Sequence, residues 1–190
     1  MLLCKYFIRT IPAMTGCLAA YLILSSCDNR QPQIRSIPQQ ALTEKQAKDE
    51  LIPSHRMYVK QEEDEIKQYI RQHKYNMLST PTGIYYMIIR HGEGTVPEVK
   101  NIVKVTYRIS LLDGTLCYDS KRDGPKEFMV GEDVEESGVH QAVQLMHQGD
   151  KGLFIIPSYL AMGLVGDHDK IPPGAVVVYE IDLLAVKKAD

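Results

Sequence analysis

Two stretches near the carboxy terminus decide the fold: "LLDGTLCYDSKRDGPKEFMVG" at Leu111–Gly131 and "IIPSYLAMGLVGDHDKIPPGAVVVYEIDLLAV" at Ile155–Val186. The first begins with an Asp-Gly turn, which joins antiparallel strands tightly, and continues through a Tyr-Asp pair. The second begins in an apolar strand, passes through a glycine-containing loop and a double-proline corner, and ends in a long strand. Both stretches therefore predict antiparallel strands joined by turns and one longer loop.

The neighbouring sequence extends this pattern. Strict alternation of apolar and polar residues at Ile102–Leu111 predicts a half-buried antiparallel strand. Val139–His147 predicts a short helix whose Val139, Val143 and Met146 face inward, with Gly149 just beyond its end. The other predicted strands are Ile84–Arg90, Leu116–Tyr118, Glu127–Val130, Lys151–Ile156 and Val176–Val186. Residues 79–190 are thus predicted to form an α+β domain, in which a curved antiparallel β-sheet wraps one short helix.

Residues 43–78 are predicted to form a helical segment in front of this domain. Pro53 is expected to divide the segment, and Ser54 to cap a helix that reaches about Lys74. The residues spaced to share one face of that helix are Ile66, Tyr69, Ile70 and His73. Two uses of this face stay open: packing on the domain of the same chain, or a homodimer formed through the helix Ser54–Lys74.

Residues 1–26 have the pattern of a processing signal. Lys5 and Arg9 form a basic start, and the apolar run Ile11–Leu24 is short for a membrane span. The sequence Leu24-Ser25-Ser26-Cys27 resembles a bacterial lipobox, so Cys27 is the predicted lipidation site, and residues 27–42 are predicted to be a flexible tether. An ordinary secretory signal or a short anchor is the alternative.

Lipidation of Cys27 would place the protein in the cell envelope. It would be lipid-anchored to the inner or outer membrane and face the periplasm, with surface exposure left open. Cleavage would remove Cys4 and Cys17 and lipidation would use Cys27, so only Cys117 would keep a free thiol. This arithmetic excludes a disulfide within one mature chain.

The charge balance argues against nucleic acid as a partner. Removing Lys5 and Arg9 from the 22 basic residues leaves 20 against 24 acidic residues, a net charge of −4. His140 and His147 have no third ligand at metal spacing, and Asp167–Asp169 is interpreted as a solvated turn. No metal site and no cofactor are therefore predicted.

The motifs between about Gly94 and Val186, taken in order, resemble the FK506-binding-protein (FKBP) family of peptidyl-prolyl isomerases. A Val-x-Val-x-Tyr strand ends at Tyr107, and an Asp-Gly-Thr turn begins at Asp113. The remaining matching motifs are Tyr118-Asp119-Ser120, Phe128 before Val130-Gly131, Met146–Gly149, Ile156–Gly163, Ile171–Ala175 and Tyr179. Within the family, the phrases "DGTLCYDS" and "TPTGIYY" resemble lipoprotein isomerases associated with gliding motility in Gram-negative bacteria.

This resemblance implies a peptidyl-prolyl cis-trans isomerase that accelerates rotation about Xaa-Pro bonds in exported proteins, without cofactor or metal. Its implied partners are proline-containing polypeptides. The implied catalytic residues are Tyr107, Tyr118 and Asp119, with Asp119 at the pocket edge and hydrogen-bonded to the Tyr107 hydroxyl. The implied substrate-binding residues are Phe128, Val139, Met162, Ile171 and Tyr179.

Three places depart from the family pattern, and at one of them Glu135-Glu136 replaces a segment that is typically Val-Ile-like. Val139 stands where a tryptophan is typical, and Met162 where an aromatic residue is typical. Both changes remove an aromatic ring, so the expected pocket has a smaller floor and less aromatic surface. The alternative function is therefore a catalytically weak chaperone or adaptor module that binds proline-containing segments.

Overall fold

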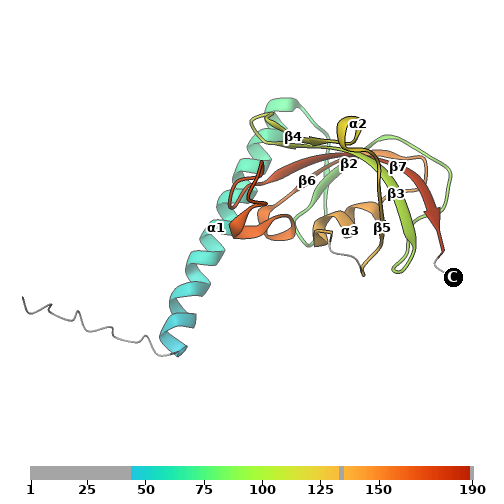
Figure 1. The fold of residues 1–190 in the computed structure, drawn as a ribbon. Helices are drawn as coiled ribbons and strands as arrows, with labels where there is room; N and C mark the ends of the chain where they lie inside the picture. The colour runs from blue at the N-terminus through green and yellow to red at the C-terminus, as the bar shows by residue number, and fades with distance from the viewer. Residues whose placement is uncertain (1–43, 133–134, 189–190) are drawn as a thin grey trace, which may run out of the picture. The chain divides into compact units, whose positions relative to one another are not determined.

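The structure, a computed structural model, describes residues 44–132 and 135–188. The predicted signal peptide, the lipidation site Cys27 and the tether lie outside the described residues. Figure 1 shows one long helix followed by a curved sheet that closes over a short helix. Within the described part of the chain, no helix has both the length and the apolar character needed to cross a membrane.

The sheet is antiparallel throughout, with strand order β1-β2-β6-β7-β3-β4 and with β5 paired to β3. The short helix α3, Ser137–Val143, lies under its concave face (Figure 1). The strands are β1 Leu78–Ser79, β2 Tyr85–Arg90, β3 Ile102–Leu111, β4 Leu116–Asp119, β5 Lys126–Met129, β6 Lys151–Ile156 and β7 Val177–Lys187. The α+β prediction is confirmed, and β1 is the strand that the sequence did not predict.

Both faces of the central strands are buried, and the pleat assigns each residue to a side. On β7, Tyr179 and Ile181 face the core that α3 covers, whereas Val178 faces a second apolar cluster. That second cluster contains Ile66, which is 1% exposed, and Tyr69 packs against it. Both residues lie on the long helix that precedes the sheet. The apolar face of the helix therefore packs on its own domain.

The long helix α1 spans Glu44–His73 and corrects the expected start at Ser54. Pro53 and Ser54 both lie within the helix, so Ser54 does not cap it. A proline removes one backbone hydrogen bond and tends to kink a helix without necessarily ending it. The preceding sequence "EKQAKDEL" consists mainly of strong helix formers, which favours continuation through Pro53.

The turn between α3 and β6 is fixed by Asp150, which is 1% exposed. Its carboxylate accepts hydrogen bonds from the backbone N of Gly92 at 2.5 Å and from the backbone N of His147 at 2.7 Å. A Cβ on Gly92 would lie 2.3 Å from the carbonyl oxygen of Gln148, so only glycine permits this approach. Asp150 thus ties the loop after β2 to the segment that follows α3.

We expect Asp150→Ala to lower the free energy of unfolding by about 2–4 kcal/mol, because it leaves two buried N–H groups without an acceptor. Asp150→Asn keeps one side-chain oxygen and should lose less. Urea denaturation of both variants measures the difference. A loss below about 0.5 kcal/mol for Asp150→Ala would show that water replaces both bonds.

Candidate active site

A small cavity lies between the concave face of the sheet and α3. The β3–β7 register pairs Ile109 with Tyr179 and Tyr107 with Ile181, and paired residues of antiparallel strands point to the same face. The cavity lining is Val105, Tyr107, Ile109, Lys126, Phe128, Glu135, Val139, Tyr179 and Ile181. These side chains enclose about 10 Å³, which is room for about one water molecule.

Polar groups stand at the rim of this apolar cavity. Lys126 Nζ lies 2.7 Å from Glu135 Oε2 and 5.7 Å from the centre of the Tyr107 ring. The Tyr179 hydroxyl donates a hydrogen bond to Glu136 Oε2 at 3.3 Å. Burial, together with the nearby carboxylates, raises the pKa of Tyr179 well above its usual value, so the phenol stays protonated and remains a donor.

Four of the sequence-predicted site residues line the cavity directly: Tyr107, Phe128, Val139 and Tyr179. Three others pack against the same buried cluster: Ile171, Tyr118 and Met162. Ile171 is 2% exposed, whereas the other two are partly buried. Seven of the eight residues therefore belong to one apolar neighbourhood.

Asp119 lies elsewhere. It pairs with Arg108 across the β3–β4 ladder, so both side chains project from the outer face, where they line a polar hollow with Glu180 and Asp182. Asp119 Oδ1 accepts from the backbone N of Lys121 at 2.8 Å and caps the short helix α2, Ser120–Asp123.

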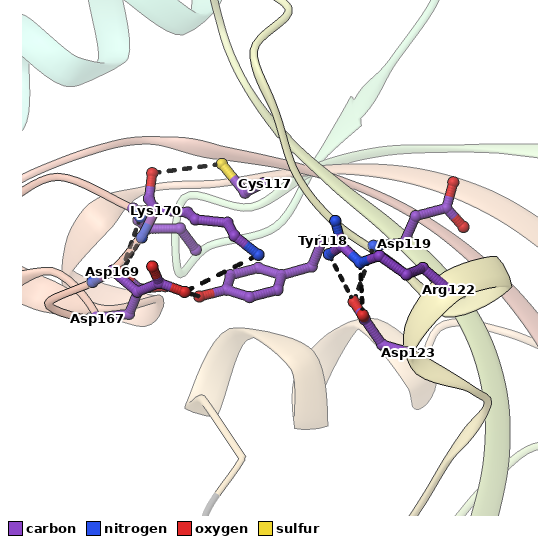
Figure 2. Close-up of polar contacts among 9 residues, drawn as sticks. Cys117, Tyr118, Asp119, Arg122, Asp123, Asp167, Asp169 and Lys170 are labelled. Carbon is purple, nitrogen blue, oxygen red and sulfur yellow. Dashed lines mark hydrogen bonds and ion pairs between the residues drawn. The ribbon is translucent and has the colours of Figure 1, made fainter.

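The hydrogen bond from Tyr107 to Asp119 that the resemblance implies does not occur among the described residues. Instead, the backbone N of Tyr107 donates to Ser120 Oγ at 3.0 Å. The cause is a register shift between Ile109 and Ser110, where β4 contains one more residue than β3 and Cys117 turns inward, 1% exposed. Tyr118, opposite Ile109, faces the cavity side and Asp119 faces away (Figure 2).

Tyr118 joins β4 to the loop that leads to Ile171. Its hydroxyl donates to Asp167 Oδ2 and lies 3.3 Å from Asp169 Oδ2, while Lys170 Nζ stands 4.3 Å from the centre of its ring. Figure 2 shows the ring extended between β4 and this loop. No sequence pattern predicted this bond, because it joins residues that are far apart in the chain.

Asp167 also shapes the loop itself. Its Oδ1 accepts hydrogen bonds from the backbone N of Asp169, Lys170 and Ile171 at 2.9, 2.9 and 2.8 Å. Burial alone would raise the pKa of Asp167, but the bonds from Tyr118 and these N–H groups outweigh it and lower the pKa to about 2. An aspartate that bonds the next few backbone N–H groups is a known turn former, so this part of its role was readable from the sequence.

Because the pKa of Asp167 is lowered by folding, its contribution to stability is complete above about pH 4 and is lost as the pH falls toward about 2. We expect Asp167→Asn to be less stable than wild type at neutral pH and to lose less further stability between about pH 5 and about pH 2. Urea denaturation across this range measures both slopes. Asp169→Asn is the matched control, and equal slopes for wild type and Asp167→Asn would contradict the assignment.

Known proteins resemble this chain in sequence. The model of the FKBP-type peptidyl-prolyl cis-trans isomerase family matches residues 94–184. The probable FKBP-type peptidyl-prolyl cis-trans isomerase FkpA of Neisseria meningitidis is 31% identical over 159 residues, covering 82% of this chain and 57% of that protein. The FKBP-type 22 kDa isomerase of Escherichia coli is 37% identical over 110 residues, covering 57% of this chain and 52% of that protein. The chain spans about half the length of these curated relatives.

Solved structures resemble it in fold. The crystal structure of FkpA from Escherichia coli is 25% identical with a TM-score of 0.59, and the match covers 79% of this chain and 76% of that one. The peptidyl-prolyl cis-trans isomerase of Pseudomonas syringae pv. tomato is 30% identical with a TM-score of 0.58, covering 70% of this chain and 96% of that one. Sequence and fold agree, and the chain belongs to the FKBP-type peptidyl-prolyl cis-trans isomerase family.

Proposed function

We propose that this chain accelerates cis-trans rotation about Xaa-Pro bonds in exported polypeptides. The observation that carries the proposal is the cavity under the sheet, where Tyr107, Phe128 and Tyr179 stand around Val139 with aliphatic residues between them. Aromatic walls suit a prolyl ring, and the Tyr179 hydroxyl supplies a protonated donor at the rim.

The barrier to rotation is about 18–20 kcal/mol because the amide is resonance-stabilised. Twisting the bond removes its double-bond character and makes the carbonyl less polar. A water-poor pocket therefore binds the twisted amide better than either planar isomer, and preferential binding of this kind lowers the barrier. A thousandfold acceleration needs only about 4 kcal/mol of such preference. No proton has to move, so no general base is required.

Substrate entry requires the cavity mouth to open. The free space holds about one water molecule, and the Lys126–Glu135 ion pair and the Tyr107 ring stand at its rim. A prolyl ring enters only when these side chains move apart. Separating an ion pair that is partly exposed to water is easy, so the mouth can open at low energetic cost.

A polypeptide substrate also suits the surface beside the pocket. Leu164 and Val165 are 70% and 63% exposed on the short turn that follows Met162. Exposed apolar side chains next to a binding pocket offer contacts for residues that flank the proline. The alternative proposal, a catalytically weak proline-binding chaperone or adaptor, draws support from the small floor residue Val139 and the nearly closed mouth.

Asp119 acts as a positioning residue, which does not touch the substrate itself. It caps α2, and the first residue of α2, Ser120, accepts the hydrogen bond from the backbone N of Tyr107. The cap thereby supports the adjoining parts of β3, which carries Tyr107, and β4, which carries Tyr118.

We further propose that the protein acts in the cell envelope, anchored through lipid on Cys27. A relative from Legionella longbeachae, 34% identical over 110 residues, is named outer membrane protein MIP. A homodimer through α1 stays a prediction. Since Ile66 and Tyr69 pack on the sheet of the same chain, a dimer would have to use another face of the helix.

An Xaa-Pro peptide assay coupled to a protease tests the enzyme proposal on the full-length chain in mild detergent. We expect Tyr107→Ala and Phe128→Ala to lower kcat/KM by about tenfold or more, equal to about 1.4 kcal/mol of lost transition-state binding. Asp119→Ala should lower it by only about two- to threefold, because it acts through the backbone. Absence of rate enhancement in the wild type, with retained binding of proline-containing peptides, would favour the chaperone alternative.

A further inference from the structure

Helix α1 reaches two loops of the domain through side chains one helical turn apart. The Tyr58 hydroxyl donates a hydrogen bond to the carbonyl oxygen of Gly174 at 3.0 Å. Glu62 accepts one from the hydroxyl of Ser158 and another, at 3.1 Å, from its backbone N. Residues four apart share a helix face, so both contacts come from the same side of α1.

These two loops carry Met162 and Ile171, which the family resemblance implies for substrate binding and which belong to or pack against the buried cluster under the sheet. Ser158 begins the short turn η1, Ser158–Leu160, which leads to Met162. Gly174 ends the double-proline corner that begins at Ile171. The loops are also bonded to each other, because the backbone N of Gly174 donates to the carbonyl oxygen of Gly163 at 2.9 Å. Tyr58 and Glu62 thus hold both members of a linked pair of loops.

The Glu62 contact is buried and does not involve an ion pair. Glu62 is 4% exposed and Ser158 is 0% exposed. None of the ion pairs between described residues includes Glu62, so its two bonds from Ser158 offset much of the cost of burying the carboxylate. Replacing both partners of a buried hydrogen bond by apolar groups of the same shape can be nearly neutral or stabilising. Stability alone therefore does not account for a glutamate here, whereas fixing the loop against one turn of the helix does.

The Tyr58 contact depends on a glycine at its acceptor. Gly174 has a φ of 69°, and a Cβ at this position would lie 2.1 Å from the Tyr58 hydroxyl oxygen. The backbone conformation favours glycine, and a Cβ would push the Tyr58 hydroxyl away from this bond. The loop is therefore shaped to receive the Tyr58 side chain.

We propose that Tyr58 and Glu62 are positioning residues of the isomerase pocket, which makes α1 part of the catalytic unit. By fixing Gly174 and Ser158 they hold Ile171 and Met162 against the buried cluster that also contains the residues lining the cavity. The inference rests on the proposed isomerase function. Its physical reason is that preferential binding of a twisted amide needs walls at defined positions, and small displacements of binding groups lower rates strongly.

The test compares Tyr58→Phe and Glu62→Ala with wild type in the full-length chain, at a temperature where circular dichroism shows every variant folded. We expect both to lower kcat/KM for an Xaa-Pro peptide by about tenfold. Glu62→Gln can still accept from the Ser158 backbone N and should retain most activity. Asp64→Ala removes an exposed side chain of the same helix and should match wild type.

A second measurement follows the loop without turnover. In protein labelled with ¹³C at methionine methyl groups, we expect the Met162 signal, assigned by Met162→Leu, to shift or broaden in Tyr58→Phe and Glu62→Ala only. Unchanged kcat/KM together with an unchanged Met162 signal would overturn the proposal and leave α1 a purely stabilising role. An inactive wild type would overturn the proposed function instead, and the Met162 signal would then decide the positioning role alone. Tyr58→Phe removes one hydroxyl and keeps the proposal testable if Glu62→Ala does not fold.

Discussion

The antiparallel pairing of β3 with β7 is the constraint on which the rest of the structure depends. The pairs run from Leu111 and Val177 to Ile102 and Lys187. Because side chains alternate along a strand, this register turns Tyr107 and Tyr179 toward α3 and leaves the partners Arg108 and Glu180 on the outer face. A slip of one residue would exchange the two faces and remove the aromatic walls of the cavity.

The loops beside the cavity have no sheet partners, so side chains from distant elements hold them. Tyr118 on β4 bonds Asp167 from one direction, and α1 bonds Gly174 and Ser158 from the other. Loop backbone needs such partners when it is buried. The positions of Met162 and Ile171 therefore depend on contacts with residues that are far apart in the chain.

Several elements were predictable because local patterns decide them. Alternation predicted β3 with its observed bounds, and the inward set Val139, Val143 and Met146 was correct, since each of these residues is at most 4% exposed. The start of α1 was wrong, because a proline is only a statistical helix boundary and the flanking helix formers outweighed it. The two-residue strand β1 was missed, because so short a segment has no measurable period.

The sequence by itself determined the family, the sheet and the apolar composition of the pocket, because alternation and turn residues act over a few positions. Only the tertiary structure decided which way Asp119 points, since one additional residue in β4 shifts the pleat against β3. It alone brought Lys126 to Glu135 at the cavity mouth and Glu62 to Ser158 beneath the loop. These contacts join residues whose separation along the chain carries no periodic signal, so they appear only when the whole domain is packed.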